Sequence, residues 1–250
     1  MDAASTRAPQ SAGPAPGALP PARRARHRPT AVIFDMDGLM LDTEPLAARA
    51  WTDAAAGLGI SFDHAVTRHL IGRNHRDCVH VIRAHHGDDY PVEAVMQAWH
   101  GAYEAIIGRE GIALKPGLVA LLDWLDAEGI PRAVATSTRR TRAERKLATT
   151  GILDRFLALV GGDEVSSGKP APDIVLAAAA RLGVPVTECV VLEDSEPGVN
   201  AALAADAMPI MVPDLLQPSE ALLARAPLLF ESLVEVQAHL AALPLPDRVR

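Results

Sequence analysis

The hydrophobic positions of this chain form short apolar runs, and longer segments with helical spacing lie between these runs. The first run covers residues 31–34 and leads directly into Asp35, which is typical of a strand buried on both faces. Two helical segments end close to a glycine, the residue that most often follows a helix C-terminus. We therefore predict further strands at residues 131–135, 158–161, 190–192 and 209–212, and helices at residues 141–149, at residues 172–182 and from about Pro197.

The alternation of these strands and helices predicts a doubly wound α/β fold. Strands joined through helices pair in parallel by right-handed crossovers, so the alternation builds one sheet with helices on both faces. Residues 43–113 interrupt the alternation, because they keep helical spacing for longer than one crossover needs. We predict a Rossmann-like core of residues 30–42 and 114–243, with an inserted α-helical cap domain at residues 43–113.

The first 29 residues differ in composition from the rest of the chain. They are rich in proline, alanine, serine and glycine, and they become basic between Arg23 and Arg28. No apolar segment follows the basic cluster, which disfavours a secretory signal. The composition predicts a disordered extension, and it leaves open a targeting segment or a later translation start.

Bulk composition excludes several classes of partner. Hydrophobic residues make up 49% of the chain and charged residues 22%, as in ordinary globular proteins. The net charge of −7 argues against binding to nucleic acid or to an anionic membrane, so an anionic substrate would need a locally positive pocket. The two cysteines, Cys78 and Cys189, have no metal-ligand spacing and are read as reduced thiols. We expect a cytoplasmic monomer whose partner is a small molecule.

Chemically reactive side chains follow the predicted strands. Ligands of doubly wound sheets bind beyond the carboxyl ends of the strands, so residues just after the strands are candidates for a site. These candidates comprise carboxylates, hydroxyls and one lysine. They are Asp35 and Asp37 after the first strand, Thr136 and Ser137 after the second, Lys169 before the helix at 172, and Glu193 and Asp194 after a later strand.

This set of residue types fits phosphoryl transfer. The Asp35 carboxylate can attack phosphorus and form an acyl phosphate. A divalent cation must screen the encounter of two anions, and hard oxygen ligands suit Mg²⁺. Asp35 and Asp194 can supply carboxylates to the metal, and Asp37 can supply its backbone carbonyl. The Asp37 side chain is then free to protonate the leaving alkoxide and later to activate water, a role that requires a raised pKa. The Lys169 ammonium and the hydroxyl of Thr136 can hold phosphate oxygens.

Residues 35–45, DMDGLMLDTEP, resemble the first motif of the haloacid dehalogenase superfamily, in particular its branch of β-phosphoglucomutases and phosphoglycolate-type phosphatases. The resemblance extends from about residue 32 to residue 213 and includes residues 135–137, 168–173 and 191–195. It implies a mobile helical cap that closes over the substrate. It also implies roles for the candidates: Asp35 as nucleophile, Asp37 as general acid and base, Thr136 and Lys169 as phosphate ligands, Asp194 as metal ligand, and Glu193 as an indirect partner of the metal. We also predict that Ser137, next to Thr136, binds phosphate.

The predicted cap contains a loop that could select the substrate. Arg73, Asn74, His75 and Arg76 are the candidates there, and solvated loop charges are the alternative interpretation. Trp51 and Trp99 stand at helical positions and are predicted to pack between cap helices.

Four functions compete at this stage. A Mg²⁺-dependent phosphomonoesterase for a small phosphorylated metabolite, such as a sugar phosphate, is favoured. A phosphosugar mutase is the second candidate. It is disfavoured because Ala47 stands where β-phosphoglucomutases carry a hinge histidine and because no lysine lies between Thr43 and Ala113. A dehalogenase is disfavoured because it needs neither the second aspartate nor magnesium. A non-catalytic phosphometabolite-binding protein would be expected to have lost part of the residue set, which is intact.

Overall fold

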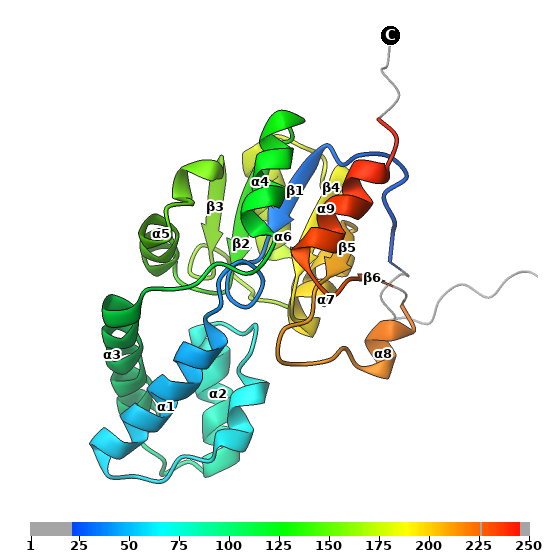
Figure 1. The fold of residues 1–250 in the computed structure, drawn as a ribbon. Helices are drawn as coiled ribbons and strands as arrows, with labels where there is room; N and C mark the ends of the chain where they lie inside the picture. The colour runs from blue at the N-terminus through cyan, green and yellow to red at the C-terminus, as the bar shows by residue number, and fades with distance from the viewer. Residues whose placement is uncertain (1–21, 226, 246–250) are drawn as a thin grey trace, which may run out of the picture.

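The computed structural model describes residues 22–225 and 227–245. Within these residues the strands form one parallel sheet in the order β3-β2-β1-β4-β5-β6 (Figure 1). The predicted doubly wound class is confirmed. The strands are β1 (Ala31–Phe34), β2 (Arg132–Thr136), β3 (Ala158–Gly161), β4 (Cys189–Glu193), β5 (Met208–Met211) and β6 (Leu228–Leu229).

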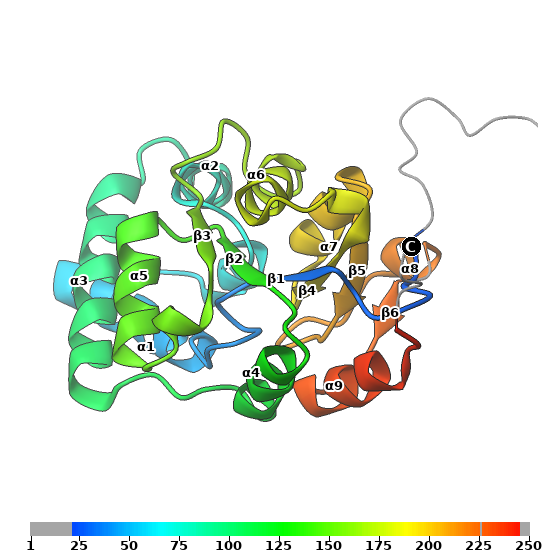
Figure 2. The ribbon, with the colours of Figure 1, turned by 90° about the horizontal axis from the view of Figure 1, so that it is seen from above.

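Helices cover both faces of the sheet. α4 (Leu118–Ala127) and α9 (Leu233–Ala242) lie on one face, and α6 (Asp173–Leu182) and α7 (Glu196–Ala204) lie on the other (Figure 2). Successive side chains of a strand point to opposite faces. Accordingly, Val32 and Phe34 belong to the apolar cluster under α4 and α9, and Ile33 belongs to the cluster under α6 and α7.

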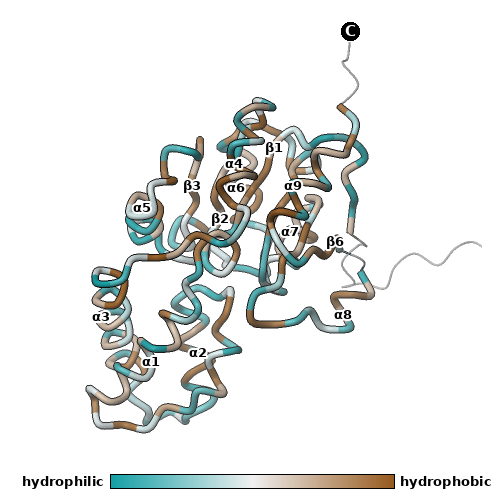
Figure 3. Tube along the Cα trace, in the orientation of Figure 1, coloured by the Kyte–Doolittle hydropathy of each residue, from teal (hydrophilic) through white to brown (hydrophobic). Residues whose placement is uncertain are grey.

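Three long helices occupy the predicted cap: α1 (Glu44–Leu58), α2 (His75–His86) and α3 (Val92–Glu110). They have their own apolar core, in which Trp51 and Trp99 stack at 4.9 Å between ring centroids, as predicted. Figure 3 shows apolar segments on these helices apart from those of the sheet. The chain enters and leaves the cap side by side, because the Asp42 amide donates to the Ala113 carbonyl at 2.9 Å. The exact bounds of a cap domain stay a prediction.

Several elements of the core had no counterpart in the sequence prediction. They are α4, α8 (Glu220–Leu223), α9 and the two-residue strand β6. Residues 1–21 of the predicted extension lie outside the described residues. Residues 22–29 run along the core, where the Arg28 guanidinium lies over the Trp124 ring. Among the described helices, none is long and apolar enough to cross a membrane.

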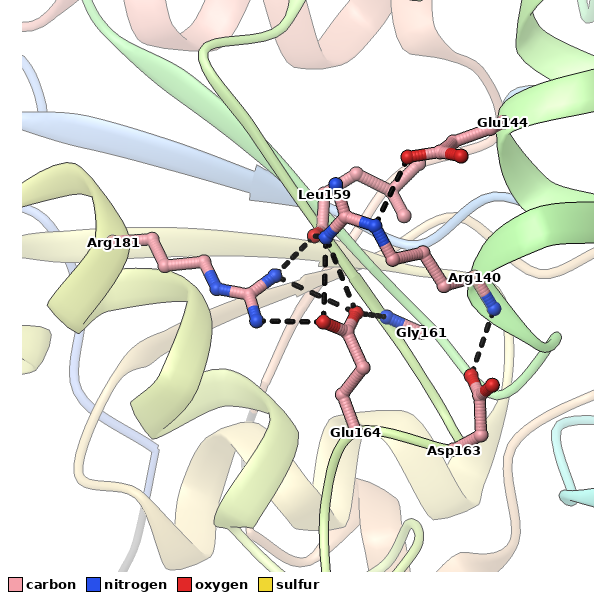
Figure 4. Close-up of polar contacts among 7 residues, drawn as sticks. All are labelled: Arg140, Glu144, Leu159, Gly161, Asp163, Glu164 and Arg181. Carbon is pink, nitrogen blue, oxygen red and sulfur yellow. Dashed lines mark hydrogen bonds and ion pairs between the residues drawn. The ribbon is translucent and has the colours of Figure 1, made fainter.

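The Glu164 carboxylate links the edge strand β3 to two helices through hydrogen bonds and ion pairs (Figure 4). Glu164 accepts hydrogen bonds from the Gly161 amide at 2.7 Å and from Arg181 of α6 at 2.8 Å. Arg140, at the start of α5 (Arg140–Thr149), contacts the same carboxylate at 3.3 Å and donates to the Leu159 carbonyl at 2.8 Å. Burial acts to raise the pKa of Glu164, but the two arginines and the amide outweigh it and lower the pKa to about 2.

Glu164→Gln is expected to lower the free energy of unfolding by about 1–2 kcal/mol at about pH 7, a value reduced for solvent screening of a partly exposed site. Because the folded pKa is depressed, this stabilisation is present above the ordinary glutamate pKa and is lost as the pH falls toward 2. Urea unfolding at about pH 7 and about pH 3 measures it, and the difference between wild type and variant should shrink at the lower pH. Glu231→Gln, at an exposed glutamate with no ion pair among the described residues, is the control and should change stability little. Equal changes of stability in the two variants would contradict the role of Glu164 in linking β3 to the helices.

Candidate active site

Asp35, Lys169 and Glu193 meet at the carboxyl edge of the sheet. Asp35 directly follows β1, and its amide donates to the Leu192 carbonyl of β4 at 2.9 Å. Lys169 comes from the loop after β3, and its ammonium lies between the Asp35 carboxylate and Glu193 Oε1, 2.5 Å from the latter. Burial alone would lower the pKa of Lys169, but the two carboxylates raise it above its ordinary value. Lys169 is therefore a buried cation between two buried carboxyl groups.

A third carboxylate leaves this cluster with an excess of negative charge. One carboxylate oxygen each from Asp35, Glu193 and Asp194 lies within 4.8 Å of the others, and all three residues are buried. Burial, together with repulsion from Glu193, raises the pKa of Asp35 to about 7 although Lys169 opposes the shift. Burial and the same neighbouring carboxylates raise the pKa of Asp194 well above its usual range. Three converging hard oxygen donors with one compensating ammonium are a suitable site for a small divalent cation such as Mg²⁺.

Two glycines allow this close packing. Gly38 has a φ of 86°, and a Cβ atom there would lie 2.3 Å from Asp194 Oδ2. The turn after Asp37 therefore packs directly against the Asp194 carboxylate. Gly198, in the first turn of α7, faces Glu193 in the same way, since a Cβ atom would lie 1.8 Å from its Oε1.

Glu193 also orders the loop that carries Asp194. Its Oε2 accepts hydrogen bonds from the amides of Asp194 and Ser195, at 3.1 and 3.2 Å, and from the Ser195 hydroxyl at 2.9 Å. Ser195 in turn caps α7, because its Oγ accepts from the Gly198 amide at 3.3 Å. The indirect contact of Glu193 with a metal stays a prediction, and its hydrogen bonds give it a further part in placing Asp194.

The expectation of a raised pKa for Asp37 is wrong for this arrangement. Asp37 Oδ1 accepts from the Lys146 ammonium at 2.6 Å, and Oδ2 accepts from the Thr138 hydroxyl at 2.7 Å. Burial acts to raise the pKa of Asp37, but Lys146 and these hydrogen bonds outweigh it and lower the pKa. The cause is a lysine from α5 that the sequence analysis did not assign to the site.

Thr136 is the last residue of β2, and Ser137 follows it. Both residues line the cavity that Asp35 also lines. The buried Thr136 Oγ1 accepts from the Thr138 amide at 3.1 Å. The Ser137 hydroxyl donates to the Gly72 carbonyl of the cap at 2.9 Å. Their contact with phosphate stays a prediction, and Ser137 adds a link between core and cap.

A cavity of about 270 Å³ lies between the sheet edge and the cap helices. Among the described residues, no carboxylate pairs with Arg142, which instead contacts the His100 ring at 2.8 Å. Burial and Arg142 lower the pKa of His100 to about 4, so this histidine is neutral at pH 7. The cavity lining combines the carboxyl groups of Asp35, Asp37, Glu44 and Glu104 with five basic side chains that an anionic substrate could contact. The basic side chains that line it are Arg68, Arg73, Arg139, Arg142 and Lys146.

The four cap-loop candidates divide into two groups. Arg73 and His75 line the cavity. Asn74 instead caps α2, since its Oδ1 accepts from the Asp77 amide at 3.0 Å. The Arg76 side chain is 76% exposed and lies outside the cavity lining. Only Arg73 and His75 are therefore placed to contact a ligand in this arrangement.

Other cavity residues had not been singled out from the sequence for this site. Thr138, Lys146 and Arg142 come from the segment after β2, and Glu44 and Tyr103 come from α1 and α3. A signal existed for Lys146, because it is one of three lysines among 24 basic residues. Burial, followed by repulsion from Asp37, raises the pKa of Glu44 to about 7, although two lysines oppose the shift.

Known proteins resemble this chain over most of its length. A family model described as haloacid dehalogenase-like hydrolase matches residues 29–206, a range that contains all the candidate residues from Asp35 to Asp194. Fructose-1-phosphate phosphatase YqaB of Escherichia coli is 33% identical over 175 residues, which is 70% of this chain and 91% of that protein. β-Phosphoglucomutase of Bacillus subtilis is 33% identical over 181 residues, 70% of this chain and 79% of that protein.

Solved structures agree with these sequence matches. The crystal structure of CbbY from Rhodobacter sphaeroides in complex with phosphate has a TM-score of 0.73 and 30% identity, and the match covers 83% of this chain and 96% of that one. The similar proteins include both a phosphatase and a mutase. Similarity alone therefore leaves the choice between hydrolysis and phosphate migration to the residues of the site.

Proposed function

The chain belongs to the haloacid dehalogenase-like hydrolases and is a phosphatase of that family, and from this premise we propose that it is a Mg²⁺-dependent phosphomonoesterase for a small sugar phosphate. The observation that carries the proposal is the convergence of Asp35, Lys169 and Asp194 below a cavity lined by arginines. The small cavity and the five basic side chains in its lining suit a compact anionic metabolite. A relative that is covered over 91% of its length is named as a fructose-1-phosphate phosphatase, which supports the sugar phosphate class.

The first proposed step transfers the phosphoryl group to the protein. An Asp35 carboxylate oxygen attacks phosphorus, and the bond between phosphorus and the sugar oxygen breaks. The departing alkoxide takes a proton from the Asp37 carboxyl, so the products are an aspartyl phosphate and the free alcohol. Because Lys146 lowers the pKa of Asp37 in the substrate-free fold, this step proceeds through the minor protonated form of that carboxyl group. Lys169 balances the buried negative charge beside the nucleophile, and Thr136 and Ser137 are proposed to hold phosphate oxygens.

The second proposed step restores the protein. The Asp37 carboxylate takes a proton from a water molecule whose oxygen attacks phosphorus. The bond between phosphorus and Asp35 breaks, which releases inorganic phosphate and the free carboxylate. Asp35, Asp194 and the backbone carbonyl of Asp37 would hold Mg²⁺, which supplies charge neutralisation for the meeting of two anions.

Mutase chemistry is the alternative on the same site. It requires a bisphosphorylated intermediate to turn over in the cavity. The cavity is lined by Ala47 where the mutases carry a hinge histidine, and no lysine occurs between Thr43 and Ala113. These departures favour hydrolysis.

Phosphate release from a panel of phosphomonoesters tests the proposal. The panel includes hexose and pentose phosphates, phosphorylated polyols, nucleotides and phosphoglycolate, each with and without Mg²⁺. We expect Mg²⁺-dependent release that is fastest with a sugar phosphate. A folded protein that releases no phosphate but isomerises β-glucose 1-phosphate would overturn hydrolysis in favour of the mutase. No turnover in either assay would favour a binding protein.

Mg²⁺ is expected to raise the melting temperature more at about pH 8 than at about pH 5.5. The pKa of Asp35 in the metal-free fold is about 7, above the ordinary value of 3.8, and that of Asp194 is raised as well. The stabilisation that these raised pKa values give to the metal-free fold is fully present below the ordinary carboxyl pKa. It is lost as the pH rises through the pKa of the folded state. Metal competes with those protons, so its stabilising effect grows with pH and reaches about 5 °C at saturation.

Thermal melts with Mg²⁺ or with a chelator at the two pH values measure this effect. Asp194→Asn is the control, because it removes one proposed ligand and should remove most of the Mg²⁺ shift. A shift that is equal at both pH values would contradict the assignment of these carboxylates as the metal site.

A further inference from the structure

Lys146 is the one described lysine that joins the candidate acid of the core to a cap helix. It lies on α5, its side chain is 9% exposed, and its ammonium is 2.6 Å from Asp37 Oδ1. The same ammonium lies over the Tyr103 ring of α3, 4.9 Å from the ring centroid. Tyr103 is itself buried and stacks on Trp99, which lines the cavity.

Asp37 is held from both of its carboxylate oxygens. Thr138 donates to one oxygen and Lys146 to the other, so two core groups define the direction in which the carboxyl faces the cavity. Proton transfer to a leaving oxygen requires a heavy-atom approach of about 2.6–3.2 Å, and small misplacement of a reacting group is costly. The group that sets the Asp37 orientation therefore affects the rate without touching the substrate.

The compact ammonium of a lysine suits position 146 better than the guanidinium of an arginine would. The other basic residues of α5 are the arginines Arg140, Arg142 and Arg145, and they contact groups near the surface or the cavity. Burying an ammonium costs free energy unless it is paired. A compact ammonium can approach a carboxylate and a ring face in a space too narrow for a planar guanidinium.

From this geometry we infer that Lys146 is a positioning residue, which fixes the Asp37 carboxylate for proton transfer and couples its orientation to the cap through Tyr103. The inference rests on the proposed function, because it assumes that Asp37 gives a proton to the leaving group. A cap helix that shifts on substrate binding would move Tyr103 relative to Lys146, so that closure and orientation of the acid occur together.

The test compares leaving groups by kcat/KM, which reports the steps up to phosphoryl transfer. An alkyl phosphate needs a proton on its leaving oxygen, whereas p-nitrophenyl phosphate leaves without one. For Lys146→Met we expect kcat/KM to fall about 10- to 100-fold with the alkyl phosphate and at most about 3-fold with p-nitrophenyl phosphate. Removal of Lys146 also removes the cation that lowers the pKa of Asp37, which by itself would increase the protonated fraction, so a fall in kcat/KM reports lost orientation of the acid. Tyr103→Phe keeps the ring but removes the hydroxyl, which also hydrogen-bonds with the Lys146 ammonium, and should show the same selective loss at about 3- to 10-fold.

Lys115→Met is the matched control. Lys115 pairs with Asp214 at 2.6 Å and with Asp42 at 3.4 Å, and none of its described ion pairs is with Asp37. This variant should leave the ratio of the two kcat/KM values unchanged. Equal losses with both substrates in Lys146→Met, or no loss with either, would overturn the positioning role while leaving the phosphatase reaction intact. If Lys146→Met does not fold, the ratio in Tyr103→Phe decides. Absence of Mg²⁺-dependent release by the wild type would instead overturn the proposed function.

Discussion

Asp35→Asn is expected to abolish Mg²⁺-dependent phosphate release, with a fall in kcat of about 10³-fold or more. The amide has nearly the shape of the carboxylate but is not a competent nucleophile toward phosphorus. The direction of the Asp35 pKa shift shows that burial disfavours the charged form at this position. Loss of the charge should therefore preserve the fold, and Lys169 keeps its second partner, Glu193.

Steady-state release of phosphate measures this loss, and thermal melts of the metal-free proteins supply the control. We expect the metal-free melting temperature of Asp35→Asn to lie within a few degrees of the wild type or above it. A folded Asp35→Asn that retains a large part of wild-type activity would exclude Asp35 as the nucleophile.

Gly198→Ala is expected to have the largest effect on stability and an indirect but large effect on activity. The added Cβ would lie 1.8 Å from Glu193 Oε1, so the Glu193 carboxylate or α7 must move. Lys169 and the Asp194 and Ser195 amides hold that carboxylate, which leaves it little freedom. Overpacking of this kind costs about 3 kcal/mol, and displacement of Asp194 should lower activity about 100-fold.

Gly101→Ala is the matched control for this substitution. Gly101 is also helical, in α3, and a Cβ atom there would have no contact within 4 Å. The control should stabilise the protein by about 0.5–1 kcal/mol through helix propensity and leave activity unchanged. Urea unfolding and phosphate release compare the pair. Equal stability of the two alanine variants would contradict the close packing of α7 on Glu193.

The positions that sequence reasoning predicted well are those next to strands. Asp35 follows an apolar run that is buried on both faces, and the carboxyl ends of parallel strands meet at one edge. The placement of Asp194 after β4 followed from the same reasoning. The apolar strand pattern and the parallel sheet topology therefore predicted both the fold and the position of the acidic cluster.

The pairing of Asp37 with Lys146 could not be predicted in this way. The two residues are 109 positions apart, and α5 presents several basic side chains in succession. Which of them turns inward depends on how α5 packs against the cap helix α3, and this is a property of tertiary structure. The environment of Asp37, and with it the direction of its pKa shift, was for this reason wrongly predicted.

Cap-loop residues were also beyond sequence reasoning. Adjacent positions in the segment 73–76 have different environments, because the start of α2 uses Asn74 as its cap and directs Arg76 to solvent.

The two-residue strand β6 had too short an apolar signal to be recognised.

Identification of the phosphorylated residue tests the aspartyl-phosphate mechanism most directly. The enzyme is mixed with Mg²⁺ and its preferred phosphomonoester, quenched with acid during turnover and reduced with borohydride, which converts an acyl phosphate to a primary alcohol. Mass spectrometry of the peptides then locates the modified side chain. We expect reduction at position 35 only, and none without substrate. Reduction at Asp37 or Asp194, or at no aspartate despite rapid turnover, would contradict the proposed role of Asp35.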